Sequence, residues 1–314
     1  MSFRTLFWSK YALFAVILMA VVIIPAIVFG SSKTIYVDHG ASSNAQDGTY
    51  DHPYHDISSA LDHAGDGDKV IIHDGTYKEH VTIPKGVTVE GNSKDRGKVV
   101  IDGGSNKPAV TMKHGTSLSF VTVKNGKDGI SVVKDALAKL YDVLVKGADR
   151  DGIHVEKAPL EKNHRLYAEK VEVRDSGKAG IYSDARYTVL VNCSFHDNGT
   201  DGVDFLAGVK GWLENVTSNG NGGSGWKAVV DGSDIWSRNN QFRNNGREGV
   251  EIESFGATGS FGVKSSKTVD NGRWGIALVA RNASASSMWK SIFLEKNSSW
   301  GNRYGNVSSV IRAN

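Results

Sequence analysis

The sequence predicts an all-β protein, a right-handed parallel β-helix (solenoid) preceded by an N-terminal transmembrane helix and a short capping helix. The solenoid rests on a repeated turn motif, Asn-Gly-x-x-Gly-Ile/Val with small variations, whose second glycines fall at positions 129, 152, 180, 202, 225, 249 and 275. The resulting spacings of 22 to 28 residues are typical of solenoids. Between the turns, Val171 and Val173 alternate with polar residues, which is strand periodicity, and no repeat has room for a helix.

The N-terminal 30 residues form the first predicted element. Residues 11–29 are an uncharged run of 19, long enough to span a bilayer, and Arg4 and Lys10 precede them. The positive-inside rule then places the N-terminus in the cytoplasm. A signal peptide cleaved before Ser31 is the alternative. We therefore expect a cytoplasmic stub and transmembrane anchor (or uncleaved signal) over residues 1–30 and a β-helix domain over residues 31–314, membrane-anchored and extracytoplasmic, or secreted after cleavage.

The first coils and a cap follow this segment. Alternating apolar runs at residues 69–73 and 87–90, separated by Asp-Gly and Pro-Lys-Gly turns, predict the first coils. Residues 56–63 carry Ile57, Ala60 and Leu61 at helical spacing, so we expect a helix that covers the open end of the solenoid. No comparable cap follows Trp300.

Stacked coils bring like residues into columns about 4.8 Å apart. We expect the turn asparagines to form a ladder of amides that bond to the next coil, and the residues after the second glycines to fill the core. Cys193 aligns with Val171 and Val216, which predicts a buried, inert thiol. The ladder positions are Asn125, Asn198, Asn221, Asn245 and Asn271, with Ser176 substituting, and the core positions are Ile130, Ile153, Ile181, Val203, Trp226, Val250 and Ile276.

Charge and cysteine content exclude two classes of protein. The formal charge of +3 falls to +1 once Arg4 and Lys10 are left out, so the body of the chain has no basic surface for nucleic acid. A single cysteine, Cys193, allows neither an intrachain disulfide nor a zinc site built from cysteines.

Several segments resemble the pectin-lyase-like superfamily: TIYVDHG at residues 34–40, the stretch at residues 57–91, and the Asn-Gly turns to about residue 276. The resemblance implies a parallel β-helix over about residues 34–310 and an extracellular polysaccharide as the partner. Residues 198–204 also resemble the first acidic motif of polygalacturonases, but their Gly-His-Gly and Arg-Ile-Lys motifs are absent. The Asp-Pro-His-Asp motif of alginate epimerases is absent too, because Phe205 follows Asp204.

Alternation turns the residue two after each second glycine outward. In register, neighbours in this column would form charge pairs, Asp204 with Lys227 and Lys227 with Glu251. Glu156, Asp184 and Glu253 lie beside it, and Arg186 and Arg281 follow. The column reads Ser131, His154, Tyr182, Asp204, Lys227, Glu251 and Ala277.

The column predicts a groove for a sugar chain, with His154, Tyr182, Asp204, Lys227 and Glu251 as candidate catalytic residues. In a uronate lyase or epimerase, Arg186 or Lys227 would neutralise the uronate carboxylate while His154, Lys227 or Tyr182 moves protons. In a hydrolase, Asp204 would pair with Glu251, or with the closer Asp201. Loops at residues 157–164 and 254–261 would wall the groove.

Other features add candidates to this face. The aromatic rings of Trp274 and Trp300, at turn positions, would stack on sugar rings, with Trp274 the candidate for substrate binding beside Arg186. No cofactor is required by the pattern, and calcium held by carboxylates such as Glu156 and Asp184 is an option. The alternative function is a noncatalytic surface module, structural or adhesive, in which the column is a solvated charge ladder.

Overall fold

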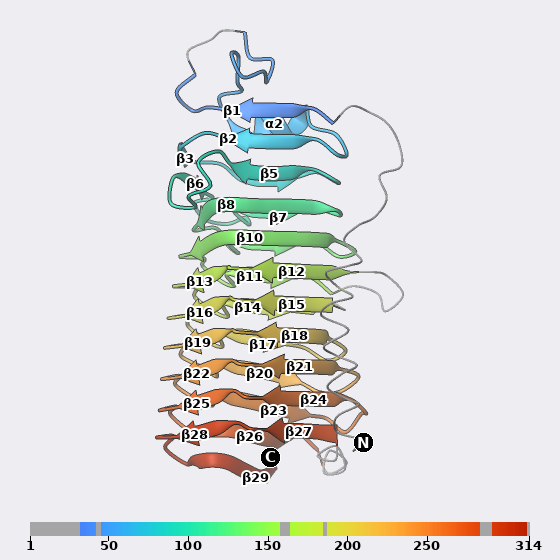
Figure 1. Cartoon of the computed structure of the whole chain (residues 1–314), viewed down its shortest axis with the longest axis vertical. Coiled ribbons are helices and arrows are strands. Elements are labelled where there is room, and N and C mark those ends of the chain that lie inside the picture. Colours follow the sequence, from blue (N-terminus) through green and yellow to red (C-terminus); the bar gives the residue numbers. More distant parts are fainter. Residues whose placement is uncertain (1–31, 42–44, 158–163, 185–186, 283–290, 313–314) are drawn as a thin grey trace. The chain divides into compact units, whose positions relative to one another are not determined.

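The strands of the protein stack coil upon coil into two parallel sheets (Figure 1). The computed structural model describes residues 32–41, 45–157, 164–184, 187–282 and 291–312. The ten-stranded sheet contains β4 (Val81–Ile83), β7 (Val110–Met112), β9 (Ile130–Val132), β11 (Ile153–Val155), β14 (Ile181–Ser183), β17 (Val203–Phe205), β20 (Trp226–Val229), β23 (Val250–Ser254), β26 (Trp274–Ala280) and β29 (Gly305–Arg312).

The nineteen-stranded sheet is the larger of the two and lies in front of the ten-stranded sheet in Figure 1. Its strands are β1 (Thr34–Val37), β2 (Lys69–Ile72), β3 (Gly75–Tyr77), β5 (Thr88–Gly91), β6 (Val99–Asp102), β8 (Thr116–Lys124), β10 (Leu137–Lys146), β12 (Arg165–Glu169), β13 (Glu172–Arg174), β15 (Tyr187–Val191), β16 (Ser194–His196), β18 (Lys210–Glu214), β19 (Thr217–Asn219), β21 (Asp234–Arg238), β22 (Gln241–Arg243), β24 (Ser260–Lys264), β25 (Lys267–Val269), β27 (Ile292–Glu295) and β28 (Ser298–Trp300).

From β12 onward, each coil contributes two strands to the larger sheet and one to the ten-stranded sheet, whereas β8 and β10 each run through their coil as one long strand. In the coil of β15, β16 and β17, the chain bends between β15 and β16 at Asn192, which has φ of 53°. Asn215 and Asn239 make the same left-handed bend in the next two coils, with φ of 54° and 59°. Asparagine tolerates this conformation better than most residues because its short polar side chain bonds locally.

The glycine-rich turns pack so closely that a side chain would not fit. A Cβ on Gly249 would lie 2.6 Å from the carbonyl oxygen of Gly275 in the next coil. A Cβ on Gly246, the first glycine of the same turn, would lie 2.3 Å from the carbonyl oxygen of Gly222 in the preceding coil. The repeated glycines are therefore required by the approach of one backbone to the next, in addition to the turn geometry.

The predicted asparagine ladder is confirmed from Asn198 onward. The side-chain amide of Asn245 donates to Oδ1 of Asn271 at 3.0 Å, while its own Oδ1 accepts from the backbone and side-chain nitrogens of Asn221. The ladder ends at Asn302, whose Oδ1 accepts from Asn271 at 2.8 Å. Asn125 differs from the prediction, because its amide donates to the Asp102 carboxylate instead.

The predicted core is confirmed as well. All seven residues of the predicted core column are at most 1% exposed. Trp226 replaces an aliphatic residue there and packs its ring against Phe261 at a centroid distance of 4.7 Å. Cys193 is buried, and burial raises the pKa of its thiol to about 12, so it stays a neutral thiol at physiological pH.

The predicted helix forms as α2 (Ile57–Asp62), one residue shorter at each end than expected. Asp56 caps it by accepting from the Ser59 backbone nitrogen, and Glu79 accepts from the first two backbone nitrogens of the helix. Its apolar side packs against β1, β2 and β4, the first strands of the solenoid.

The predicted fold class is corrected in one respect, the N-terminal transmembrane helix. Residues 11–29 lie outside the described residues, and within the described ones no helix is both long and apolar enough to cross a membrane. The described helix, α2, has 6 residues and therefore a length of about 9 Å, against the ~30 Å of a bilayer core. The fold class is thus an all-β parallel solenoid with one short helix among the described residues.

Candidate functional site

The outward residues of the ten-stranded sheet form the predicted column, which we call the polar column. Strand register pairs His154 with Tyr182, Tyr182 with Asp204, Asp204 with Lys227 and Lys227 with Glu251. Ser131 precedes this run and Ala277 follows it. The five candidate catalytic residues therefore occupy five successive coils on one face of one sheet.

A second column lies beside the first, three residues earlier in each coil, and we call it the turn column. Its members share the position before the second glycine of each turn. The contact between Asp151 and His154, with Oδ2 and Nδ1 3.1 Å apart, shows how closely the two columns approach. Sequence reasoning named only Asp201 and Trp274 of this column, although the repeat itself marks every position. The turn column reads Asp128, Asp151, Ala179, Asp201, Ser224, Glu248 and Trp274.

The upper part of the site is held by Arg150. Its Nε and Nη2 donate to the two carboxylate oxygens of Asp128 at 2.8 and 2.7 Å, and Nε lies 3.4 Å from Oδ2 of Asp151. Asp128, Asp151 and His154 are close enough to bind a metal ion together, but the guanidinium already engages both oxygens of Asp128. The His154 ring lies parallel to Tyr182, with centroids 5.1 Å apart and 2° between the planes.

Asp204 is the most perturbed carboxyl group at the centre. Burial raises its pKa to about 7, with Asp201 and Glu253 adding to the rise and Lys227 opposing it. Its Oδ1 atom is buried and has no hydrogen-bond partner among the described residues. Burial also raises the pKa of Asp201, whose Oδ1 accepts from the Ser224 backbone nitrogen at 2.6 Å.

Below Asp204, the predicted charge pairs are replaced by others. Lys227 lies 4.0 Å from Oε2 of Glu253, and neither Asp204 nor Glu251 comes within ion-pair distance of it. Glu251 instead accepts from the Ser224 hydroxyl at 2.8 Å and from Arg247 at 3.1 Å. The register prediction is right, but the pairs are wrong because Glu253, two residues along the strand, offers the nearer carboxylate.

Glu251 is the second carboxyl group with a large shift. It is 1% exposed, and burial raises its pKa to about 7, opposed mainly by the Arg247 guanidinium. Arg281 pairs with Glu253 and lies 3.7 Å from Oε1 of Glu251. Two carboxyl groups with a pKa near 7 thus lie on either side of Lys227.

Of the remaining predicted residues, some are described by the structure and others are not. Arg186 and residues 158–163 of one predicted wall lie outside the described residues. Trp274 is half-buried and meets Tyr304 edge-on at 6.2 Å, whereas Trp300 is exposed. In the other predicted wall, Phe255 is 53% exposed, and its backbone nitrogen is bound by the Asp231 carboxylate.

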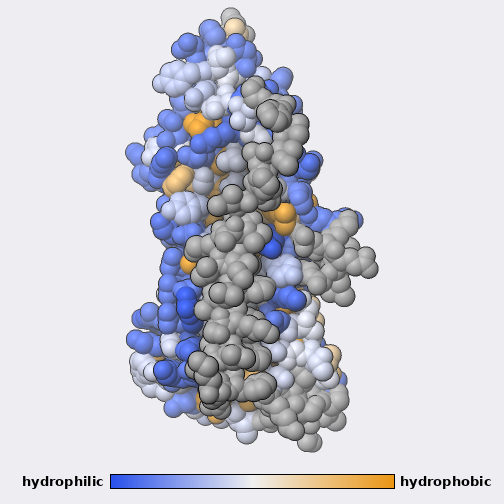
Figure 2. Space-filling view, turned by 45° about the vertical axis from the view of Figure 1, so that its right-hand side comes forward, coloured by the Kyte–Doolittle hydropathy of each residue, from blue (hydrophilic) through white to orange (hydrophobic). Residues whose placement is uncertain are grey.

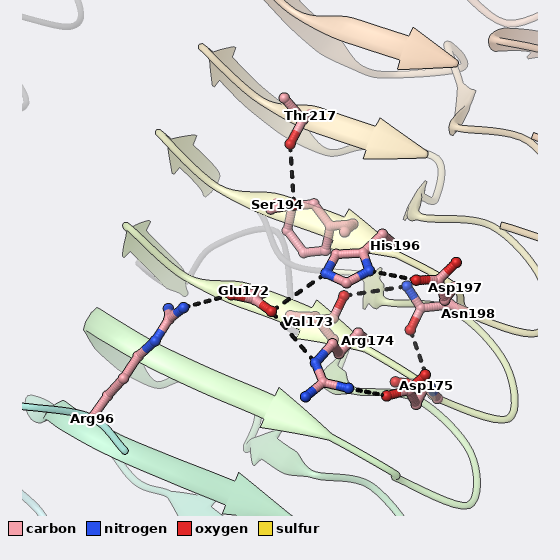
Figure 3. A network of polar contacts seen from close by, with 12 residues as sticks. Arg96, Glu172, Val173, Arg174, Asp175, Ser194, His196, Asp197, Asn198 and Thr217 are labelled. Carbon is pink, nitrogen blue, oxygen red and sulfur yellow. Dashed lines mark hydrogen bonds and ion pairs between the residues drawn. The ribbon is translucent and has the colours of Figure 1, made fainter. Parts of the chain in front are cut away.

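The nineteen-stranded sheet carries a separate ionic cluster centred on Glu172 (Figure 3). Arg96 lies 2.5 Å from one carboxylate oxygen of Glu172, and Arg174 and His196 each lie 3.4 Å from the other. A hollow of about 500 Å³ lies beside this cluster. Elsewhere in Figure 2, the coloured surface is mostly hydrophilic, with hydrophobic residues appearing singly. The cluster contacts neither column, so it is not part of the candidate site.

Comparisons with known proteins agree with this architecture. A pectate lyase, Pel9A, is 13% identical with a TM-score of 0.51, and the match covers 90% of this chain and 80% of that chain. A tailspike protein, Dettilon, is 14% identical with a TM-score of 0.56, covering 89% and 62% of the respective chains. XylC, solved with xylose, is 12% identical with a TM-score of 0.54, covering 79% and 67%. At these identities the likeness establishes the fold alone.

A search of curated proteins finds no significant match. The family model described as "Right handed beta helix region" matches residues 128–287, which is half of the chain and contains every coil of the polar column from His154 to Ala277. The resemblance to pectin-lyase-like proteins is thereby confirmed. The chain belongs to the right-handed β-helix family.

Proposed function

We propose that the protein binds an extended extracellular polysaccharide along the polar and turn columns and hydrolyses its glycosidic bonds there. One observation carries the hydrolase proposal: Asp204 and Glu251, two coils apart in register, both have a pKa of about 7. Structural neighbours that include a pectate lyase and a protein solved with xylose support a sugar ligand on this fold.

The spacing of the two carboxyl groups fits an inverting reaction. Two strand spacings amount to about 9.6 Å between backbones, just beyond the upper limit of the ~6.5–9.5 Å that separates the carboxyl groups of inverting glycosidases. Asp204 gives its proton to the glycosidic oxygen as the bond to the anomeric carbon breaks. Glu251 takes a proton from the water that attacks this carbon from the opposite face. Asp201 favours the protonated form of Asp204, because two adjacent carboxylates repel each other.

A uronate lyase or epimerase is the second candidate, and Lys227 is the observation that favours it. Nearby carboxylates raise the pKa of Lys227 despite its burial, so it is cationic at neutral pH and would neutralise a uronate carboxylate. Burial also raises the pKa of the Tyr182 phenol, so this group is a proton donor at neutral pH and not a base. His154 would then take the C5 proton.

The experiment incubates the full chain with neutral and uronate polysaccharides, and follows reducing ends together with ultraviolet absorbance from unsaturated uronate. Reducing ends alone support the hydrolase, and NMR of the first product anomer should show inversion. Both signals rising together would show a lyase.

Three variants assign the site: Asp204→Asn, Glu251→Gln and, as the matched control on the same strand face, Thr111→Ala. We expect turnover to fall by about 10²–10⁴-fold in the first two and to stay unchanged in the control. The noncatalytic surface module would be favoured if the folded protein produces neither signal with any polymer and NMR shows that the sugar composition of the polymer is unchanged.

A further inference from the structure

Five cations that border the two columns are engaged by carboxylates of the same face: Arg150, Arg247, Arg273, Arg281 and Lys227. Arg150 is held by Asp128 and Asp151. Arg247 lies 3.3 Å from Glu248 and 3.1 Å from Glu251. A cation held in this way offers little attraction to an incoming anion, because its field is already balanced at close range.

The lower cations are engaged in the same way. Arg281 pairs with Glu253, whose other oxygen lies 4.0 Å from Lys227. Arg273 lies 3.7 Å from Glu248. A uronate carboxylate that approached these cations would have to share them with Glu253 and Glu248, whose side chains are 4% and 5% exposed.

The groups left to meet a substrate are hydrogen-bond acceptors. Oδ1 of Asp204 is buried without a partner among the described residues, and a buried oxygen in that state gains most from an incoming donor. A sugar hydroxyl is such a donor. A uronate carboxylate is an acceptor only, and next to Asp201 and Asp204 it would add a third negative charge or force protonation.

We infer that the substrate is a neutral polysaccharide, one whose units present hydroxyl groups to these columns and carry no carboxylate. This inference rests on the proposed hydrolase site and names its substrate class. It sets aside the uronate polymers that the sequence suggests, because these five described cations already pair with protein carboxylates of the same face.

Binding separates substrate class from turnover. Affinity electrophoresis of the full chain in gels containing β-glucan, mannan, unsubstituted xylan or polygalacturonate should show retardation by a neutral polymer and none by polygalacturonate. Raising the salt concentration should not weaken binding to the neutral polymer, since no ion pair is formed. Equal or stronger retardation by polygalacturonate would overturn the inference.

A charge variant tests the cause. Glu253→Gln removes the carboxylate shared by Lys227 and Arg281 and should increase affinity for polygalacturonate by about ten-fold. Glu90→Gln is the matched control, since it removes a carboxylate from its Lys69 pair on the other sheet with the same change in net charge. A gain of equal size in both variants would show a general charge effect and contradict the role of this face.

The failures of the two proposals are distinguishable. A neutral polymer that binds but is not cleaved would contradict the hydrolase and leave the substrate class standing. Hydrolysis of polygalacturonate would confirm the hydrolase and contradict the substrate class. No binding to any of the polymers would contradict both.

Discussion

Oδ2 of Asp151 lies 3.1 Å from Nδ1 of His154, and the same oxygen lies 3.4 Å from Nε of Arg150. A carboxylate at this distance accepts a hydrogen bond from the Nδ1–H group, which leaves Nε2 of the neutral imidazole as the acceptor. The ring is also held parallel to Tyr182. The turn column therefore orients a side chain of the polar column, the His154 imidazole.

Asp151→Asn should change the tautomer of His154. The amide can donate to Nδ1, so the ring proton should move to Nε2. The two ring nitrogens of the neutral imidazole should then exchange their ¹⁵N chemical shifts in long-range NMR spectra. Asp197→Asn, beside His196 on the other sheet, is the control and should leave His154 unchanged. An unaltered His154 spectrum in Asp151→Asn would show that this contact does not set the tautomer.

Asp204→Asn should stabilise the fold at alkaline pH. The pKa of about 7 in the folded state lies above the ordinary aspartate value of 3.8, so the folded state binds the proton more tightly. Stability is therefore lost as the pH rises from about 4 to about 7, and an amide avoids that loss. We expect the variant to gain about 1–3 kcal/mol at pH 8 and nothing below pH 4, measured by urea unfolding. Asp175→Asn, at an exposed site, should show no such pH dependence. A variant less stable than the parent at pH 8 would contradict the assigned shift.

Turnover should follow a bell-shaped pH profile centred near 7. The reaction needs one protonated and one ionised carboxyl group, and Asp204 and Glu251 each have a pKa of about 7. The rate falls at low pH as the base becomes protonated and at high pH as the acid loses its proton. The measurement is kcat/KM across pH 4 to 10 on the polymer that is cleaved. A plateau extending to pH 10 would exclude Asp204 as the proton donor.

Turnover should survive treatment with EDTA. Both oxygens of Asp128 are bound by Arg150, so the closest candidate metal cluster already contains a fixed cation. The check compares initial rates after chelation with those after calcium is added back. If chelation abolishes the rate and calcium restores it, carboxylates such as Glu156 and Asp184 become the candidates for an ion site.

Asn245→Ala should destabilise the solenoid by about 1–3 kcal/mol, the cost of leaving buried partners unsatisfied. Asn245 is 2% exposed and bonds to both neighbouring coils through Asn221 and Asn271. Thr200→Ala, exposed in a related turn, should change the free energy of unfolding by less than about 0.5 kcal/mol. Thermal and urea unfolding of the three proteins gives the comparison, and equal stability would show that the ladder contributes no net free energy.

The repeat made much of the fold predictable from sequence. A glycine every coil fixes which residues stack, so Ile153 could be assigned to the core and His154 to the outer face without coordinates. The sequence did not place the turn column beside the polar column, because the distance between the two columns depends on how tightly each turn folds. The sequence paired Lys227 with Asp204 and Glu251, but its ion pair is with Glu253. Strand register alone does not show in which direction a long side chain extends toward a neighbouring column.

The shifts of Asp204 and Glu251 were also beyond the sequence. Both residues look like ordinary surface acids in an alternating strand, since nothing in the pattern distinguishes an outward carboxyl group in water from one covered by its neighbours. Burial is the largest cause of the two raised pKa values, neighbouring carboxylates add to it, and both depend on how the coils assemble.

The close approach of glycine backbones at the turns limits how this protein can vary. A side chain added at Gly246 or Gly249 would collide with the adjoining coil, so these turn positions accept only glycine. Length differences between coils accumulate instead after the strands of the ten-stranded sheet, at residues 156–164 and 255–259. The edge formed by the glycine turns is thus constant from coil to coil, whereas the edge after the strands of the ten-stranded sheet carries loops of variable length. Grafting a loop from one coil to another at the second edge should alter ligand preference while the stacking of the solenoid stays intact.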